Sequence, residues 1–146
     1  MRVGPSGFRQ GAALALFLEL IALGLSFGLQ PADEVVAQVL AYSGYGALLP
    51  PLAWTIASWG LTVGWLAGLI GTLAFRPLGR VVLTASLLGW TLLPWLGGLQ
   101  VLTVSTVPAG MAFTISIWLA AISFADPRIA VHFGGPMPPE VGEIFE

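Results

Sequence analysis

The chain has 146 residues, enough for one domain, with a net charge of −2 and no cysteine. Hydrophobic residues make up 57% of it and charged residues 8%, against roughly 25% charged residues in a soluble domain. This composition argues against a soluble domain, and without a basic patch there is no electrostatic footprint for nucleic acid. The lack of cysteine excludes disulfides, thiolate catalysis and cysteine-ligated metals. The sequence therefore predicts an all-α integral membrane protein, and its first partner is the lipid bilayer.

The first long apolar run begins after a polar lead that carries Arg2 and Arg9. A cleavable signal peptide is an alternative interpretation of this run, because it has a positive start and an apolar core. Its length, Glu19 within it and the absence of a small-residue cleavage site favour a membrane span. In all, we expect a four-helix transmembrane domain over residues 1–128, with spans at about 11–29, 52–75, 81–99 and 108–125.

The connection after the first span begins with Pro31, Asp33 and Glu34, which are typical of the first turn of a helix. We expect a short interfacial helix over about 31–42, and an ordinary structured loop is the alternative. Arg76 to Arg80 is expected to form a tight turn between the second and third spans. Pro94 predicts a kink or an early end of the third span near Leu93.

Small residues recur along one face of the second span at heptad-type spacing. A face without bulky side chains lets another helix backbone come close, which is how helices associate in lipid. We expect its central glycines to close on the first span at the depth of Glu19. A second stripe of small residues, in the fourth span, comprises Ala112, Ser116 and Ala120. The helix-packing seam of the second span consists of Ala53, Ala57, Gly60, Gly64, Ala67, Gly68 and Gly71.

The basic residues predict the orientation. All five are arginines, and they fall before the first span, between the second and third, and after the fourth. The positive-inside rule assigns that side to the cytoplasm, so both termini are expected there. The bias toward Arg, Ala, Gly, Leu and Pro suggests a bacterial protein, and hence the cytoplasmic (inner) membrane. The topology-determining residues are Arg2, Arg9, Arg76, Arg80 and Arg128.

Residues 129–146 are rich in Gly and Pro and end in an acidic stretch with Glu140, Glu143 and Glu146. We expect a flexible acidic cytoplasmic tail, in which His132 is solvated. A short docking motif for a partner is the alternative interpretation of the last residues.

Of the ionisable residues, Glu19 is the only one that we expect inside a membrane span. An acid at a helix centre costs roughly 2.5–3.5 kcal/mol on the insertion scale, which the surrounding Leu and Phe residues offset. It shares a face with Ala12, Ala15, Ala22 and Ser26, so we expect it to point into the bundle as a neutral carboxyl. Gly24 and Gly28 form a GxxxG motif on the opposite face, so the first span can pack closely on both sides. The residues expected at its depth are Gly60, Gly64, Trp90, Thr91, Ser116 and Trp118.

Two interpretations of Glu19 stand side by side. A neutral carboxyl can fix helix packing through an interhelical hydrogen bond, or it can exchange a proton or a cationic ligand. Small four-span multidrug transporters are similar in placing a Glu in their first helix, here with Gly24 after it. Their later motifs are absent, so their function is not carried over.

Catalytic chemistry has no support in the sequence. It contains no Gly-rich phosphate loop, no nucleophile with its base, and no His/Asp/Glu ligand set, so we expect no catalytic, cofactor-binding or metal site. The first hypothesis is a non-catalytic interaction or accessory subunit that packs, through its small-residue faces, against itself or a larger membrane protein. The alternative is a small proton-coupled transporter or channel subunit working through Glu19.

The second half of the chain carries a family resemblance. Phe75-Arg76-Pro77-Leu78-Gly79-Arg80 opens the third span, and Phe124-Ala125-Asp126-Pro127-Arg128 closes the fourth, with Phe133 beyond. In this pattern the chain resembles uncharacterised four-span bacterial integral membrane proteins. The resemblance implies a four-helix membrane fold and no particular activity.

Overall fold

A computed structural model of the chain describes residues 4–28, 46–98 and 105–135, which form helices and no strand. Four of these helices are long and apolar enough to cross a membrane, which confirms the expected all-α protein with four candidate spans. The expected interfacial helix, Arg2 and the tail from residue 136 lie outside the described residues. The helices are α1 (Pro5–Gly28), α3 (Pro51–Leu73), α4 (Pro77–Leu96), α5 (Thr106–Ala125), α6 (Pro127–Ala130) and the 3-10 helix η1 (Val131–Phe133).

Prolines set where several helices start and stop. Pro51 and Pro77 begin α3 and α4, because proline suits the first helical position, where its missing N–H is not needed. The helix α4 therefore starts earlier than expected, and Arg80 lies in its first turn rather than in the connecting turn. It ends at Leu96, within a turn of Pro94, which removes a helical hydrogen bond.

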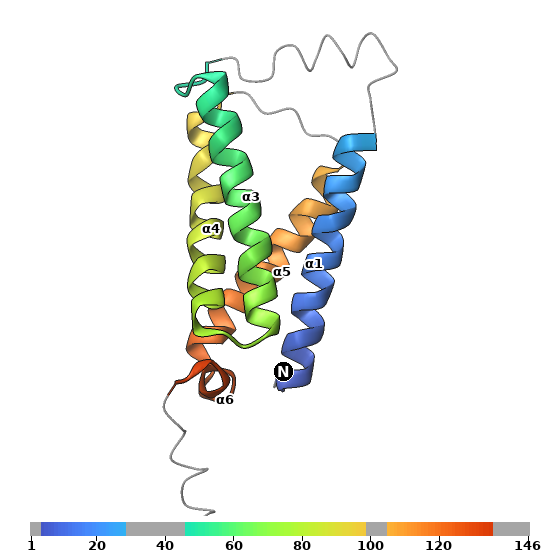
Figure 1. Cartoon of the computed structure of the whole chain (residues 1–146), viewed down its shortest axis with the longest axis vertical. Helices are drawn as coiled ribbons and strands as arrows, with labels where there is room; N and C mark the ends of the chain where they lie inside the picture. Colours follow the sequence, from blue (N-terminus) through green and yellow to red (C-terminus); the bar gives the residue numbers. More distant parts are fainter. Residues whose placement is uncertain (1–3, 29–45, 99–104, 136–146) are drawn as a thin grey trace, which may run out of the picture.

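The helices pack as two antiparallel pairs, α3 with α4 and α1 with α5. Figure 1 shows α3 and α4 side by side along their length, while α1 diverges from α3 toward the end at which α1 stops. The helix α5 lies beside α1 at that end and approaches α4 at the other. The two pairs are thus close at one end of the bundle and spread apart at the other.

The core lies between the two pairs, and many large apolar side chains point outward instead. Trp95 is 83% exposed and Phe17 is 60% exposed, which suits a surface that meets lipid rather than water. The buried apolar cluster consists of Phe8, Ala12, Ala15, Trp65, Leu69, Leu83, Leu87, Ala112, Leu119, Ala120, Ile129 and Phe133.

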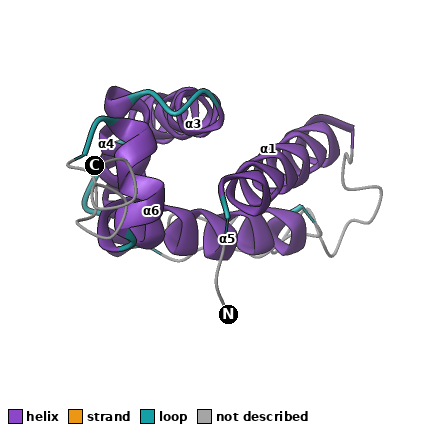
Figure 2. Ribbon diagram, turned by 90° about the horizontal axis from the view of Figure 1, so that it is seen from below, coloured by secondary structure: helices purple, strands orange, loops and turns teal. Residues whose placement is uncertain are grey.

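The segment after α5 folds back beneath the bundle instead of leaving it. Asp126 caps α6, its carboxylate accepting a hydrogen bond of 3.0 Å from the backbone N–H of Arg128. Ile129 and Phe133 are buried against the core, at 0% and 1% exposure. Figure 2, seen from below, shows α6 lying under the end of the bundle. The first residues of the expected flexible tail, 129–133, are therefore packed with the helical domain.

Candidate intramembrane site at Glu19

Glu19 lies on the inward face of α1, where its side chain is only 5% exposed. Ala12, Ala15 and Ala22, which share that face, are buried as well, while Phe17 on the other side is exposed. Small side chains on this face allow the neighbouring helices to come close, so the acid is enclosed by the bundle rather than by lipid.

A ring contact fixes the depth of the acid relative to α3. The rings of Phe27 and Trp59 stack with their centroids 6.0 Å apart, near the diverging ends of α1 and α3. About two turns further toward the arginine-bearing end, α1 reaches Glu19 and antiparallel α3 reaches Trp65. The acid and this buried indole therefore lie at a similar depth.

The polar groups at that depth bond to one another. The indole Nε1 of Trp65 donates a hydrogen bond of 2.9 Å to Ser116 Oγ in α5. The Ser116 hydroxyl in turn donates to the carbonyl of Ala112 at 2.7 Å. Among the described residues, Glu19 Oε2 is buried and has no hydrogen-bond partner. A buried polar atom without a hydrogen-bond partner is energetically unfavourable. This oxygen is therefore a candidate for binding a proton or a small ligand.

The other residues expected near Glu19 are placed differently. Thr91 is exposed and its hydroxyl donates to Leu88 O of its own helix at 2.7 Å, and Trp118 is 43% exposed. The Nε1 of Trp90 is buried and, like Glu19 Oε2, has no hydrogen-bond partner among the described residues. Two buried polar atoms thus stay unpaired in the upper part of the bundle.

Two pockets that are open to the outside lie above Glu19. In this part of the bundle the two helix pairs diverge (Figure 1). One of about 230 Å³ opens between α1 and α3, and its wall at Leu23 is one turn above Glu19. A second of about 230 Å³ lies beside α5, and Trp90 contributes to the walls of both. The first, which we call the upper cavity, is lined by Leu23, Ser26, Phe27, Ser58, Trp59, Thr62 and Trp90.

The seam of α3 closes on α4 and not on α1, which corrects the expected contact with the first span. A Cβ built on Gly68 would lie 2.6 Å from Leu83 Cα, and one on Gly71 would lie 2.6 Å from Gly79 Cα. A Cβ on Gly64 would lie 2.6 Å from Ser86 Oγ, also in α4. The short turn between α3 and α4 makes them antiparallel neighbours, so the glycine face of α3 packs on α4.

The remaining seam residues are less enclosed. Ala53 and Ala57 are half-buried, while Gly60 and Ala67 are exposed. A Cβ on Gly60 would meet nothing within 4 Å, and the same holds for Gly24 in α1. The seam is therefore a close-packed surface only in the half that leads to the turn.

The stripe of small residues on α5 lies inside the bundle. Ala112, Ser116 and Ala120 are buried. A Cβ on Gly11 of α1 would come within 3.4 Å of Leu119 in α5, which is ordinary contact. Gly11 therefore packs against a side chain of α5, unlike Gly68 and Gly71, which face the backbone of α4.

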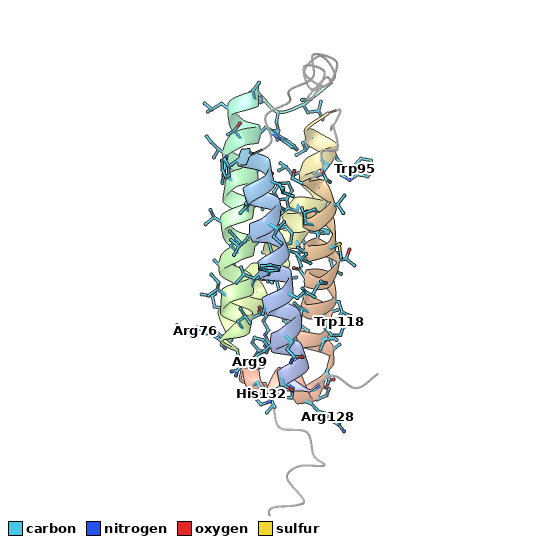
Figure 3. All side chains as sticks on the ribbon, turned by 90° about the vertical axis from the view of Figure 1, so that its right-hand side faces the viewer. Arg9, Arg76, Trp95, Trp118, Arg128 and His132 are labelled. Carbon is cyan, nitrogen blue, oxygen red and sulfur yellow. The ribbon has the colours of Figure 1, made fainter. Side chains whose placement is uncertain are left out.

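The described arginines gather at one end of the bundle, where Figure 3 shows Arg9, Arg76 and Arg128 near His132. The Arg9 guanidinium lies 4.8 Å from the centroid of the Phe75 ring. Arg80 donates a hydrogen bond of 3.1 Å to Ser123 O and lies over the ring of Phe124 at 4.6 Å. Arg9 and Arg80 therefore pack against aromatic rings as well as marking this end.

An aromatic cluster closes the same end, and its joint packing was not expected from the sequence. Phe75 lies at its centre, with ring centroids 5.7 Å from Phe8, 5.2 Å from Phe133 and 5.0 Å from His132. His132, expected to be a solvated tail residue, is exposed but packs against Phe75. The Asp126-Pro127 pair, a helix-start signal, would have indicated that this segment folds.

Within residues 4–28, 46–98 and 105–135, no group of three or more His, Asp or Glu side chains could hold a metal ion. Comparison of the chain with protein-family models, curated proteins and solved structures finds no match. The geometry around Glu19 is therefore the feature of the molecule from which a function can be inferred.

Proposed function

We propose that this chain is a small, non-catalytic protein of the bacterial inner membrane that exchanges a proton and a small ligand at Glu19. We place both termini in the cytoplasm and group the chain with the uncharacterised four-span bacterial membrane proteins that its second half resembles. One observation carries the proposed activity: Glu19 Oε2 is buried and unpartnered among the described residues, one turn from the upper cavity.

The unpaired oxygen favours exchange over a purely structural role. A carboxyl that fixes packing has to bond across the helix interface. At the depth of Glu19, however, Trp65 and Ser116 bond to each other. A lone acid without a nearby fixed cation can release its proton when a cationic ligand arrives, which is the usual role of acids in proton-coupled pathways.

Accessibility is tested with dicyclohexylcarbodiimide, an apolar reagent that modifies protonated carboxyl groups within membranes. The full-length protein in lipid vesicles is treated and digested, and the modified peptide is identified by mass spectrometry. We expect modification at Glu19 in the wild type and none at that position in Glu19→Gln. An unmodified Glu19 under conditions that modify a reference carboxyl would show that the site is closed, and the proposal would fail.

Stability separates the two interpretations of Glu19. If the carboxyl is unpaired, Glu19→Leu removes a buried polar group and should leave the unfolding free energy unchanged or raise it by about 1 kcal/mol. If it bonds across an interface, Glu19→Leu should lower that free energy by a similar amount, while Glu19→Gln retains it. Reversible unfolding in detergent measures both variants, and a destabilised Glu19→Leu would favour the structural role.

The second candidate function is an accessory subunit that docks a second copy or a larger membrane protein. Its support is that Gly24 of α1 and Gly60 of α3 are small and have open space beside them. A bulky residue there would block a neighbouring helix without disturbing the internal core. Self-association of the wild type in lipid bilayers that Gly24→Leu or Gly60→Leu abolishes would support docking, whereas a monomeric wild type would argue against self-association.

A further inference from the structure

A lipid-facing groove lies over the turn-proximal half of α3 and α4, apart from the upper cavity. It is an open groove with a volume of about 190 Å³. At its floor Gly71 and Gly79 meet backbone to backbone, because neither has a side chain to hold the two helices apart. We call it the hairpin groove, and it is lined by Ala67, Gly71, Arg76, Leu78, Gly79 and Val82.

The groove combines an apolar wall with one cation. Ala67 and Leu78 are exposed apolar residues, and Val82 is half-buried. Arg76 is exposed at the end of the groove that adjoins the turn. An apolar trough that ends in a guanidinium at the membrane interface has the chemistry of a bound phospholipid: an acyl chain in the trough and an anionic headgroup on the cation.

Among the described residues, the Arg76 side chain makes none of the contacts that hold the Arg9 and Arg80 side chains. Arg9 lies over Phe75, and Arg80 bonds to Ser123 O. Among the described residues, no ion pair joins Arg76 to either acid, Glu19 or Asp126. Within the part of the chain that the structure describes, no acidic side chain neutralises its positive charge.

From these observations we infer that the hairpin groove binds one anionic phospholipid, with its phosphate on Arg76 and part of an acyl chain between Ala67 and Val82. This goes beyond the proposed exchange at Glu19 and does not depend on it. Arg76 lies at the arginine-bearing end of the bundle. The bound lipid therefore belongs to the membrane leaflet on that side.

The inference is tested by native mass spectrometry of the full-length protein released from detergent with phosphatidylglycerol or phosphatidylcholine. We expect one retained phosphatidylglycerol, with occupancy reduced about fivefold in Arg76→Gln, because an arginine near the surface contributes about that factor. The control Arg128→Gln removes an exposed arginine at the same end that does not line the groove, and it should retain the lipid. Arg76→Lys, which keeps the charge, should retain most of it.

Further measurements distinguish binding of an intact phospholipid from binding of a free phosphate compound. Val82→Trp fills the trough and should reduce phosphatidylglycerol retention while leaving Arg76 intact. Glycerol phosphate, which has the headgroup chemistry without acyl chains, should not displace the lipid. Equal losses in Arg76→Gln and Arg128→Gln would show a diffuse charge effect and overturn the inference. Displacement by glycerol phosphate at the lipid's own concentration, or equal retention of phosphatidylcholine, would overturn it as well.

Discussion

The indole of Trp65 and the hydroxyl of Ser116 form a buried hydrogen bond of 2.9 Å that connects α3 to α5. Trp65 belongs to one helix pair and Ser116 to the other, so the bond spans the interface that also encloses Glu19. The same indole meets the ring of Phe113 edge to face at 5.7 Å, which fixes its orientation. These contacts of Trp65 fix the position of one helix pair relative to the other.

Ser116→Ala should lower the free energy of unfolding by about 1 kcal/mol, since it leaves the Trp65 N–H buried without an acceptor. The matched control is Thr114→Ala, which removes an exposed hydroxyl that bonds only to Gly110 O in the same helix. Unfolding in detergent at several denaturant concentrations measures both. Equal effects of the two substitutions would contradict a specific role for the interhelical bond.

Gly68→Ala and Gly60→Ala should differ sharply, although both replace glycine by alanine within α3. The new Cβ at Gly68 would press on the backbone of Leu83, so we expect a loss of about 1–3 kcal/mol in the free energy of unfolding. At Gly60 it meets open space, and the better helix propensity of alanine should leave stability unchanged or raised by up to about 1 kcal/mol. Thermal unfolding of the two variants, measured in parallel, compares their stabilities. If Gly68→Ala were as stable as the wild type, α3 would not be closely packed on α4.

Phe75 has a left-handed backbone, with φ of 52°, and it follows Ala74, the C-cap residue of α3, in the position that glycine usually takes. The N–H of Phe75 bonds to Thr72 O and that of Arg76 to Gly71 O, the hydrogen bonds of a Schellman motif. Both Phe75→Ala and Phe75→Gly remove the ring from the aromatic cluster, but only glycine relieves the backbone strain. We expect Phe75→Ala to be less stable than Phe75→Gly by about 1 kcal/mol in unfolding measurements. Equal stabilities would mean that the backbone at this position carries no strain.

The orientation that we propose predicts the behaviour of fusions. A reporter that is active only in the cytoplasm should be active when fused after Glu146, and a reporter that is active only outside should be inactive there. Moving the arginines tests the cause: exchanging Arg76 and Arg80 for glutamine should weaken the preference for this orientation, because it removes positive charge from the turn. If the reporter that is active only outside the cytoplasm were active after Glu146, the topology would be the inverse of the one we propose.

The helices and the inward direction of Glu19 could be predicted from the sequence because both depend on local properties. Apolar length determines which segments can span a bilayer, and the 3.6-residue period places Ala12, Ala15 and Ala22 on the face of Glu19. Proline positions would have given the helix starts more closely, since Pro77 opens α4 where a turn was expected.

The sequence by itself therefore determined the class of the protein, its candidate spans and the faces that are free of bulky side chains. Only the tertiary structure decided which faces meet: the glycines of α3 pack on α4, α1 packs on α5, and Phe133 returns to Phe75. The physical reason is that several helices offer faces of small residues, and the period of a helix does not specify the partner of a face. That choice depends on the short turn between α3 and α4 and on the joint packing of the bundle, which leaves Glu19 Oε2 unpartnered within its described part.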